Sequence, residues 1–221
     1  MKILNLYAGI GGNRKLWGNE HEVTAVEYNE NIAKVYQKFF PKDKVIVADA
    51  HQFLIEHYQE FDFIWGSPPC PTHSRMRKCF AFADDKSRIR TPEYPDMRLY
   101  QEIIFLTHFF KGNWVIENVT PYYEPLIKPQ KCGRHCFWSN FHITNKKTKG
   151  ENLEKSRINE KQKLKGFDLS NIQNVGFRKD QVLNNCVDES LGLHIFKCAF
   201  KEKQVTLGNL SLTDKTEGEK E

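Results

Sequence analysis

One short segment combines a thiol with an unusually rigid backbone. Ser67-Pro68-Pro69-Cys70-Pro71 follows an apolar run that predicts a buried strand. Proline fixes φ and lacks a backbone N–H, so these prolines cannot extend a strand ladder and they hold the thiol rigidly where the strand ends. A rigid, partly exposed cysteine is a candidate nucleophile, and Arg75, Arg77 and Lys78 would favour its thiolate. An ordinary loop thiol is the alternative.

A carboxyl group follows another apolar run. Glu117-Asn118-Val119 comes directly after residues 114–116. A carboxyl that is partly desolvated can hold or deliver a proton near neutral pH, which makes Glu117 a candidate acid. The alternative is that Glu117 only caps the end of the strand. Asn118 is expected to tie neighbouring loops together.

A glycine-rich turn follows the first apolar run. Gly9, Gly11 and Gly12 allow the backbone to bend sharply and to approach a nucleotide closely. The dinucleotide pattern G-x-G-x-x-G would place glycine at position 14, which is Arg14, so a pyrophosphate-binding fingerprint is incomplete. A purely structural turn is the alternative.

Two acidic residues end the second and third apolar runs. Glu27 lies eighteen residues after Gly9, where a carboxylate can accept hydrogen bonds from both hydroxyls of a ribose. Asp49 can bind an adenine amino group, or it can cap the helix expected to follow it. Together the two acids describe a pocket for an adenosine that requires no phosphate.

All these groups follow runs that are rich in apolar, β-favouring residues. The expected strands cover residues 2–7, 22–27, 44–47, 61–65 and 114–116, and the clearest expected helices cover residues 30–40 and 94–110. Strands that alternate with helices predict an α/β fold with a doubly wound, mostly parallel sheet. In such a sheet the ligand binds beyond the carboxyl ends of the strands, so the five strand ends predict a single site.

The composition suits one globular domain. The chain has 221 residues, of which 39% are apolar, enough for a substantial core. It has no apolar run near eighteen residues, and its first residues do not resemble a secretion signal, so we expect no membrane association and a cytoplasmic location with reduced thiols. Cys132, His135 and Cys136 provide only three candidate zinc ligands without a matching second pair, so no metal site is expected.

The chain divides into four parts by composition. Residues 1–144 contain the alternating core, and residues 145–177 are mostly polar and predict a surface excursion. Residues 178–200 return to the core with a helix that places Val187, Leu191, Ile195 and Cys198 on one face. Residues 201–221 form a charged tail that is expected to fray.

Five sequence strings carry a resemblance to a known family. LNLYAGIGG, AVEYNE, ADA, GSPPC and IENV, in this order, resemble the DNA (cytosine-5) methyltransferases that use S-adenosylmethionine. Asp96-Met97-Arg98 looks like the end of the family's mobile catalytic loop, and Arg134 stands where the family has an arginine after its Glu-Asn motif. The resemblance covers residues 2–144 and 178–200, and it is closest to the compact members found in phages and mobile elements.

The closing part of the resemblance is looser. Arg178, Gln181, Asn185 and Val187 look like the family's closing motifs. Two positions depart from the family pattern, because Asn184 stands in place of a glycine and Pro71 in place of a glutamine. The family's large target-recognition domain is reduced here to about thirty residues, 145–177.

The resemblance implies a Rossmann-like S-adenosylmethionine-dependent methyltransferase and assigns roles to matching residues. The implied catalytic residues are Cys70, Glu117, Arg134 and Asn118. The implied S-adenosyl-L-methionine-binding residues are Tyr7, Ala8, Gly9, Gly11, Gly12, Glu27, Tyr28, Asp49, Ala50, Pro69, Asn185 and Val187. No residue is assigned to a metal.

The basic residues cluster beside the expected site. Residues 128–149 contain six lysines and arginines and no acid, and residues 75–98 contain seven basic and four acidic side chains. Such clusters are typical of phosphate contacts, although a solvated surface is the alternative. The expected nucleic-acid-binding residues are Arg75, Arg77, Lys78, Arg98, Lys146 and Lys147.

The expected reaction is methylation of carbon 5 of a cytosine that is flipped out of double-stranded DNA, through a covalent adduct with Cys70. An RNA such as tRNA is an alternative substrate, and an inactive DNA-binding accessory subunit is a second alternative. A nicotinamide oxidoreductase is disfavoured by Arg14 and leaves Pro-Pro-Cys unexplained. We expect a monomer, and the short insert leaves room for a partner protein that supplies target specificity.

Overall fold

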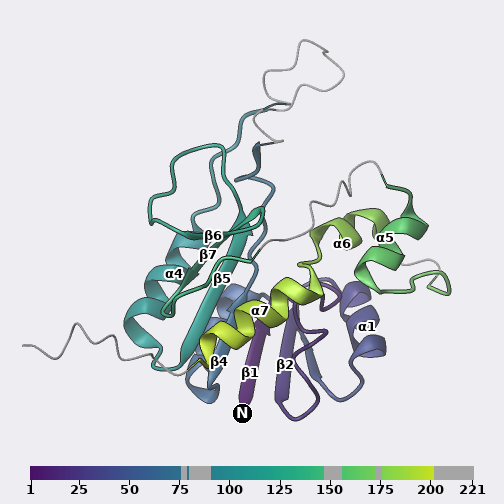
Figure 1. Cartoon of the computed structure of the whole chain (residues 1–221), viewed down its shortest axis with the longest axis horizontal. Coiled ribbons are helices and arrows are strands. Elements are labelled where there is room, and N and C mark those ends of the chain that lie inside the picture. The colour runs from purple at the N-terminus through teal and green to yellow at the C-terminus, as the bar shows by residue number, and fades with distance from the viewer. Residues whose placement is uncertain (76–78, 80–90, 147–155, 173–175, 202–221) are drawn as a thin grey trace, which may run out of the picture.

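The computed structural model describes residues 1–75, 79, 91–146, 156–172 and 176–201, and it contains a seven-stranded sheet flanked by helices (Figure 1). The strands are β1 (Lys2–Leu6), β2 (Glu22–Glu27), β3 (Lys44–Val47), β4 (Phe63–Gly66), β5 (Asn113–Val119), β6 (Gln130–Cys132) and β7 (His135–Ser139). The helices are α1 (Glu30–Phe39), α2 (Ala50–His57), α4 (Arg98–Phe109), α5 (Ile158–Lys165), α6 (Lys179–Asn185) and α7 (Glu189–Ala199), with a 3₁₀ turn at Tyr58–Glu60.

The sheet confirms the expected doubly wound, mostly parallel topology. The strand order is β3-β2-β1-β4-β5-β7-β6, and β1 to β5 are parallel to one another. The chain moves outward from β1 to β3 and then returns to place β4 on the other side of β1. Because the direction of winding reverses there, a crevice is expected beyond the carboxyl ends of β1 and β4.

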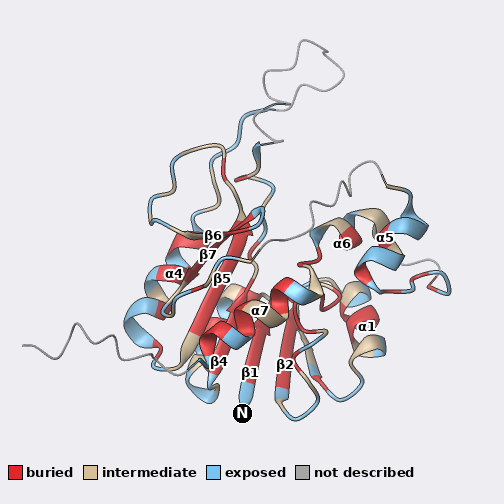
Figure 2. Cartoon of the chain, viewed as in Figure 1, coloured by how far each residue is buried: buried red, intermediate tan, exposed pale blue. Residues whose placement is uncertain are grey.

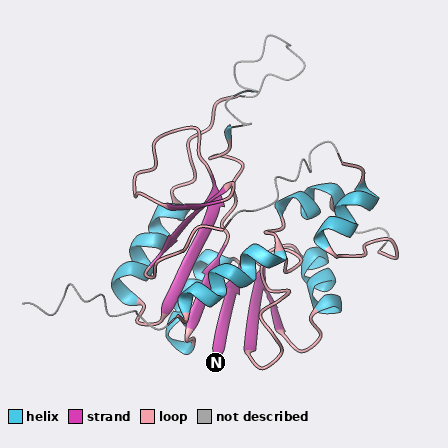
Figure 3. Cartoon of the chain, in the orientation of Figure 1, coloured by secondary structure: helices cyan, strands magenta, loops and turns pink. Residues whose placement is uncertain are grey.

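Both faces of the sheet are covered, because neighbouring residues in a strand point to opposite faces. On one face Leu4 and Leu6 pack with α2 and α4, and on the other Ile3 packs with α7. Figure 2 shows the central strands β1, β4 and β5 as mostly buried, and Figure 3 shows α7 crossing the front of the sheet. Trp17 stacks on Phe196 at 5.2 Å between ring centroids and so fixes α7 to the loop after β1.

The expected strands and helices are largely confirmed, with shifted ends. The helix expected over 94–110 begins only at Arg98, and the strand expected over 114–116 extends from Asn113 to Val119. The antiparallel hairpin of β6 and β7 was not predicted. Its two-residue turn is Gly133-Arg134, in which glycine at φ 60° occupies the left-handed conformation that such turns require.

The segment expected to be a surface excursion is partly buried, so that expectation is wrong for the part of it that the structure describes. Phe167 and Leu169 are almost fully buried, and they pack with Val35 of α1 and Leu183 of α6 in a small separate core. The segment is mostly polar because most residues of α5 are exposed, so its few buried apolar residues did not stand out in the sequence. Residues 147–155 and the tail from 202 onward lie outside the described residues.

The helix expected near the end of the chain is confirmed as α7. Leu191, Ile195 and Cys198 are buried along one face of it. In the part of the chain that the structure describes, no helix is both long and apolar enough to cross a membrane.

Candidate active site

The turn after β1 adopts backbone conformations that glycine favours. Gly9 has φ 56° and Gly11 has φ 86°, and Tyr7 adopts φ 54° between the strand and the turn. A Cβ atom on Gly11 would lie 2.3 Å from the Phe40 ring, whereas one on Gly9 would meet no atom within 4 Å. Gly9 therefore faces open space, where a ligand can approach the backbone.

Glu27 holds this turn against the end of β2. Its Oε2 accepts a hydrogen bond from the Gly9 N–H at 2.9 Å, and its Oε1 accepts one from the Asn29 N–H at 2.9 Å. A carboxylate has about four lone-pair sites, so Glu27 keeps acceptor capacity for a further donor. The position predicted for a ribose-binding acid is thus also the residue that shapes the turn.

Asp49 is the N-cap of α2, as the alternative reading expected. Its Oδ1 accepts hydrogen bonds from the backbone N–H groups of His51 and Gln52, at 2.9 and 3.1 Å. Its Oδ2 lies 3.4 Å from the guanidinium of Arg98. Arg98, predicted to bind nucleic acid, therefore lies beside the predicted cofactor acid.

A buried carboxyl that the sequence did not reveal lies behind Tyr7. Glu102 of α4 accepts a hydrogen bond from the Tyr7 hydroxyl and lies 3.0 Å from His51 Nδ1, while its Oε2 is buried without a hydrogen-bond partner among the described residues. Burial and the charge of Glu102 raise the pKa of Tyr7, and the hydrogen bond to Glu102 raises the pKa of His51. Of the other predicted cofactor residues here, Ala50 is buried and Tyr28 is largely exposed.

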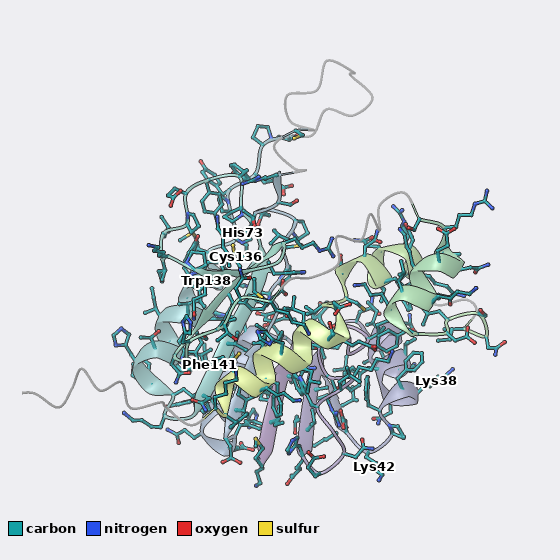
Figure 4. The ribbon with its side chains drawn as sticks, viewed as in Figure 1. Lys38, Lys42, His73, Cys136, Trp138 and Phe141 are labelled. Carbon is teal, nitrogen blue, oxygen red and sulfur yellow. The ribbon has the colours of Figure 1, made fainter. Side chains whose placement is uncertain are left out.

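The loop that carries Cys70 is tied to the loop after β5. The backbone N–H groups of His73 and Ser74 both donate to the Cys70 carbonyl at 3.0 Å, and the Tyr122 N–H donates to the His73 carbonyl at 3.1 Å. The His73 ring is buried, with Nδ1 2.5 Å from the Tyr123 hydroxyl. Figure 4 marks His73 and Cys136 toward the upper end of β5. Neither His73 nor Tyr123 was among the site residues predicted from the sequence.

Cys70 is partly exposed, as expected, whereas the pKa of its thiol is shifted in the direction that disfavours the thiolate. Burial raises the pKa of the Cys70 thiol, and the charge of Glu117 raises it further, while a backbone hydrogen bond at Cys70 and the charge of Arg134 oppose them. Arg75 is exposed. Arg77 and Lys78 lie outside the described residues.

Glu117 lies near the carboxyl end of β5 and contacts His135, which the sequence offered only as a candidate zinc ligand. Its carboxyl is nearly buried, and Oε1 lies 2.5 Å from Nδ1 of His135 on β7. The neighbouring Asn118 donates to the Pro68 carbonyl at 3.0 Å and accepts from the Val119 N–H. Asn118 therefore ties β5 to the loop after β4, which fits the expected role in holding neighbouring segments together.

Arg134 does not touch Glu117. Its Nε lies 3.3 Å from Nε2 of His135, and its terminal nitrogen lies 3.5 Å from the carbonyl of Asn184 at the end of α6. The arginine predicted to act at the site thus reaches Glu117 only through His135, which the hairpin of β6 and β7 places between them.

The segment after α6 packs against the glycine turn. A Cβ atom on Gly12 would lie 2.6 Å from the carbonyl oxygen of Val187 and 2.9 Å from Cβ of Cys186. The structure thus brings the predicted closing residue Val187 to the predicted cofactor turn, while Asn185 is exposed beside it.

The remaining predicted residues lie at the edges of the site. Pro69 precedes the thiol in the fixed loop, and Ala8 donates its N–H to the carbonyl of Val26. Lys146 donates from Nζ to the Ser190 carbonyl at 2.6 Å, and Lys147 lies outside the described residues. Among the residues that the structure describes, no group of three potential ligands is placed to hold a metal ion.

Comparison with known proteins identifies the family. Residues 1–123, more than half of the 221, match the C-5 cytosine-specific DNA methylase family. The Type II methyltransferase M.Bsp6I of Bacillus sp. (strain RFL6) is 33% identical over 90 residues, which cover 39% of this chain and 28% of that protein. The chain thus matches less than a third of this curated relative's length.

Two solved structures show weaker likenesses. A DNMT2 mutant from Spodoptera frugiperda is 27% identical, with a TM-score of 0.37, over 53% of this chain and 35% of that one. A SAM-dependent methyltransferase from Agrobacterium tumefaciens is 15% identical, with a TM-score of 0.39, over 56% and 40% of the two chains. On the match over residues 1–123, the chain belongs to the C-5 cytosine-specific DNA methylase family.

Proposed function

We propose that this chain methylates carbon 5 of a cytosine in DNA, with S-adenosyl-L-methionine as the methyl donor and Cys70 as the nucleophile. The observation that carries the proposal is the joint placement of Cys70 and Glu117. The thiol lies on a fixed loop after β4, and the carboxyl lies on the neighbouring strand close enough to raise the pKa of the thiol. The glycine turn after β1 lies on the other side of β4 in the same parallel arrangement.

The residues on the β1 side fit an adenosine-containing cofactor. The space beside Gly9 accepts a ligand against the backbone, and Glu27 keeps free lone pairs toward hydroxyl donors. Tyr7 presents an aromatic ring that its bond to Glu102 holds in place. When bound, S-adenosylmethionine supplies an electrophilic methyl group.

Cys70 and Glu117 act together on the cytosine ring. The Cys70 thiolate adds to carbon 6 and forms a carbon–sulfur bond, while Glu117 hydrogen-bonds to N3 and stabilises the added electron density. Carbon 5 is then nucleophilic and would take the methyl group as the sulfur–methyl bond breaks and S-adenosylhomocysteine leaves. A base removes the carbon-5 proton, the carbon–sulfur bond breaks, and Cys70 leaves as a thiolate from 5-methylcytosine.

The thiol must lose its proton before it attacks. Because burial and Glu117 raise the pKa of Cys70 in the chain alone, most of the thiol is protonated at neutral pH. A backbone hydrogen bond at Cys70 and the charge of Arg134 both oppose this shift, so both favour the thiolate.

The proposal that DNA is the substrate rests on how Cys70 gains access to carbon 6 of the cytosine and on the basic side chains of the surface. Carbon 6 of a stacked cytosine is inaccessible, so the base must be flipped into the crevice at a cost of a few kcal/mol. Exposed Arg75, Lys128 and Lys131 are available for DNA phosphates. Binding should therefore weaken steeply as salt increases.

The wider setting is also part of the proposal. The chain acts as a monomer in the cytoplasm, and a partner protein supplies target specificity because the segment between β7 and α6 is short. All six cysteines are unpaired, as expected in a reducing compartment.

A methyl-transfer assay tests the reaction and its substrate. Wild type and Cys70→Ala are incubated with methyl-tritiated S-adenosylmethionine and either duplex DNA or tRNA, and cofactor binding is measured separately. We expect label in DNA cytosine with the wild type only, and equal cofactor affinity for both proteins. Label only in tRNA would assign the enzyme to RNA, and turnover by Cys70→Ala would contradict the nucleophile. Label in neither polymer would favour an accessory subunit.

A further inference from the structure

The pairing of β5 with β7 brings three polar side chains into one chain of contacts. Val119 pairs with His135 and Glu117 with Phe137, so Glu117 and His135 are diagonal neighbours across the two antiparallel strands. The contacts run from Glu117 Oε1 to His135 Nδ1 at 2.5 Å, and from His135 Nε2 to Arg134 Nε at 3.3 Å. His135 is 9% exposed and Glu117 is 7% exposed, so solvent competes little for either contact.

The partners of His135 determine where its proton lies. An arginine side chain has only donors, so Nε2 of His135 must accept the hydrogen bond from Arg134 with a lone pair. An imidazolium carries a proton on both nitrogens and cannot do this. His135 is therefore neutral, with its proton on Nδ1, and it donates that proton to the Glu117 carboxyl.

We propose that His135, as the neutral Nδ1–H tautomer, is the positioning residue for Glu117, and that Arg134 fixes this tautomer. The inference deepens the proposed function and rests on it. The imidazole occupies one oxygen of Glu117 and fixes the plane of the carboxyl, which leaves the other oxygen for N3 of the cytosine. Arg134 thus acts on the acid without touching it.

The same arrangement connects the acid to the far end of the chain. Arg134 reaches the Asn184 carbonyl at 3.5 Å, so three contacts, through Arg134 and His135, link the end of α6 to Glu117. Asn184 is the residue that departs from the family's glycine. The other titratable groups facing this pair are Cys70 on the loop after β4 and Cys136 on β7, and Arg75 and Lys131 add positive charge near Cys136.

The first test determines the tautomer without requiring activity. The wild type is labelled with ¹⁵N in its histidine rings, and long-range proton–nitrogen spectra are recorded between pH 6 and 8. We expect His135 to show one protonated nitrogen, Nδ1, throughout this range, and Arg134→Gln to release a mixture of tautomers. A doubly protonated ring or a dominant Nε2–H form in the wild type would overturn the proposal.

The second test separates positioning from a structural role. His135→Asn keeps an N–H donor near the place of Nδ1, whereas His135→Leu removes it, and exposed His142→Leu serves as the matched control. We expect kcat to fall about 100-fold in His135→Leu, as for a misplaced catalytic group, with the KM for S-adenosylmethionine and the melting temperature nearly unchanged. His135→Asn should recover most of this loss, and the alkaline limb of the kcat profile should move to higher pH in His135→Leu.

The outcomes distinguish this inference from the proposed function. A wild type that does not methylate cytosine would refute the function, while the tautomer measurement would still test the contacts of His135. A wild type that methylates normally, together with a His135→Leu variant whose kcat and pH profile are unchanged, would overturn the positioning role alone. Equal losses in His135→Asn and His135→Leu would also overturn it.

Discussion

The two halves of the site hold their carboxylates in different ways. Glu27, on the β1 side, is bound by two backbone N–H groups, one from its own loop and one from the glycine turn. Glu117, on the β4 side, is bound by the side chain of His135, which arrives from an antiparallel strand added beyond the parallel part of the sheet. Glu27 is therefore held by backbone groups, whereas Glu117 is held by a side chain that a substitution can remove.

This difference matches the tasks that we propose for the two acids. A group that binds a cofactor gains from a fixed position, because rigid partners lower the entropy lost on binding. A group that exchanges a proton needs a partner that can share hydrogen bonds as charge develops. Substitutions on the two sides should therefore affect different measurements.

The largest effect on turnover short of removing the thiol is expected from Glu117→Gln. The amide keeps the size of the side chain but is a poor proton donor toward N3, so kcat should fall by about 10²- to 10⁴-fold. Cofactor affinity, measured by titration calorimetry, should not change. The control is Glu124→Gln in the exposed loop beyond β5. A normal kcat in Glu117→Gln would remove the distinction between the two acids.

On the cofactor side, Glu27→Ala should weaken binding rather than chemistry. It leaves the N–H groups of Gly9 and Asn29 without their charged acceptor, each such bond being worth about 1.5–3 kcal/mol. We expect S-adenosylmethionine to bind about 10- to 100-fold more weakly, with kcat at saturation little changed. Exposed Glu30→Ala, which loses only an ion pair with Lys34, is the control. An unchanged affinity would contradict the assigned role of Glu27.

Two glycines of the same turn have different surroundings: Gly12 packs against the backbone, whereas Gly9 faces the space proposed for the cofactor. Gly12→Ala should destabilise the fold by about 1–3 kcal/mol, because its Cβ would lie 2.6 Å from a backbone carbonyl. Gly9→Ala should destabilise it by only about 1 kcal/mol, through its positive φ, yet weaken cofactor binding. Chemical denaturation and calorimetry on both variants provide the test. Stronger cofactor loss in Gly12→Ala at equal stability would reverse this assignment.

The smallest expected effect is a pH dependence of the free energy of unfolding that comes from His51. Its hydrogen bond to Glu102 raises its pKa, so its contribution to stability is complete below about pH 6.5 and is lost as pH rises through the raised value. The pair is partly exposed, so we expect less than about 1 kcal/mol. The free energy of unfolding of the wild type, relative to His51→Gln, should decrease from pH 5 to 9. His57→Gln, whose partner Glu60 is exposed, is the control. A difference that does not vary with pH would contradict the contact.

The parts of the site built from local sequence were predictable. Gly9, Glu27 and Asp49 follow strands whose apolar runs are clear, and parallel strands bring their carboxyl ends together. Cys70 and Glu117 were located for the same reason. Their positions depend on strand ends, which the sequence patterns mark within a few residues.

The parts built by long-range pairing were not predictable. His135 reaches Glu117 only because β7 runs antiparallel beside β5, and the pattern of residues 135–139 was not interpreted as a strand. The Gly133-Arg134 turn was the available signal, because a two-residue loop with glycine favours a hairpin. Glu102 gave no such signal, since a single acid in an amphipathic helix is usually exposed, whereas here it is buried against Tyr7.

The central claim is that Cys70 adds to carbon 6 of the cytosine. A duplex that contains 5-fluorocytosine tests it directly, because after methyl transfer carbon 5 carries no proton for a base to remove and the adduct cannot collapse. With S-adenosylmethionine present, mass spectrometry should find the chain joined to the oligonucleotide plus one methyl group, with Cys70 as the modified residue. The adduct should be absent in Cys70→Ala and present in Cys136→Ala. An active wild type that forms no adduct, or one attached to another residue, would contradict the account.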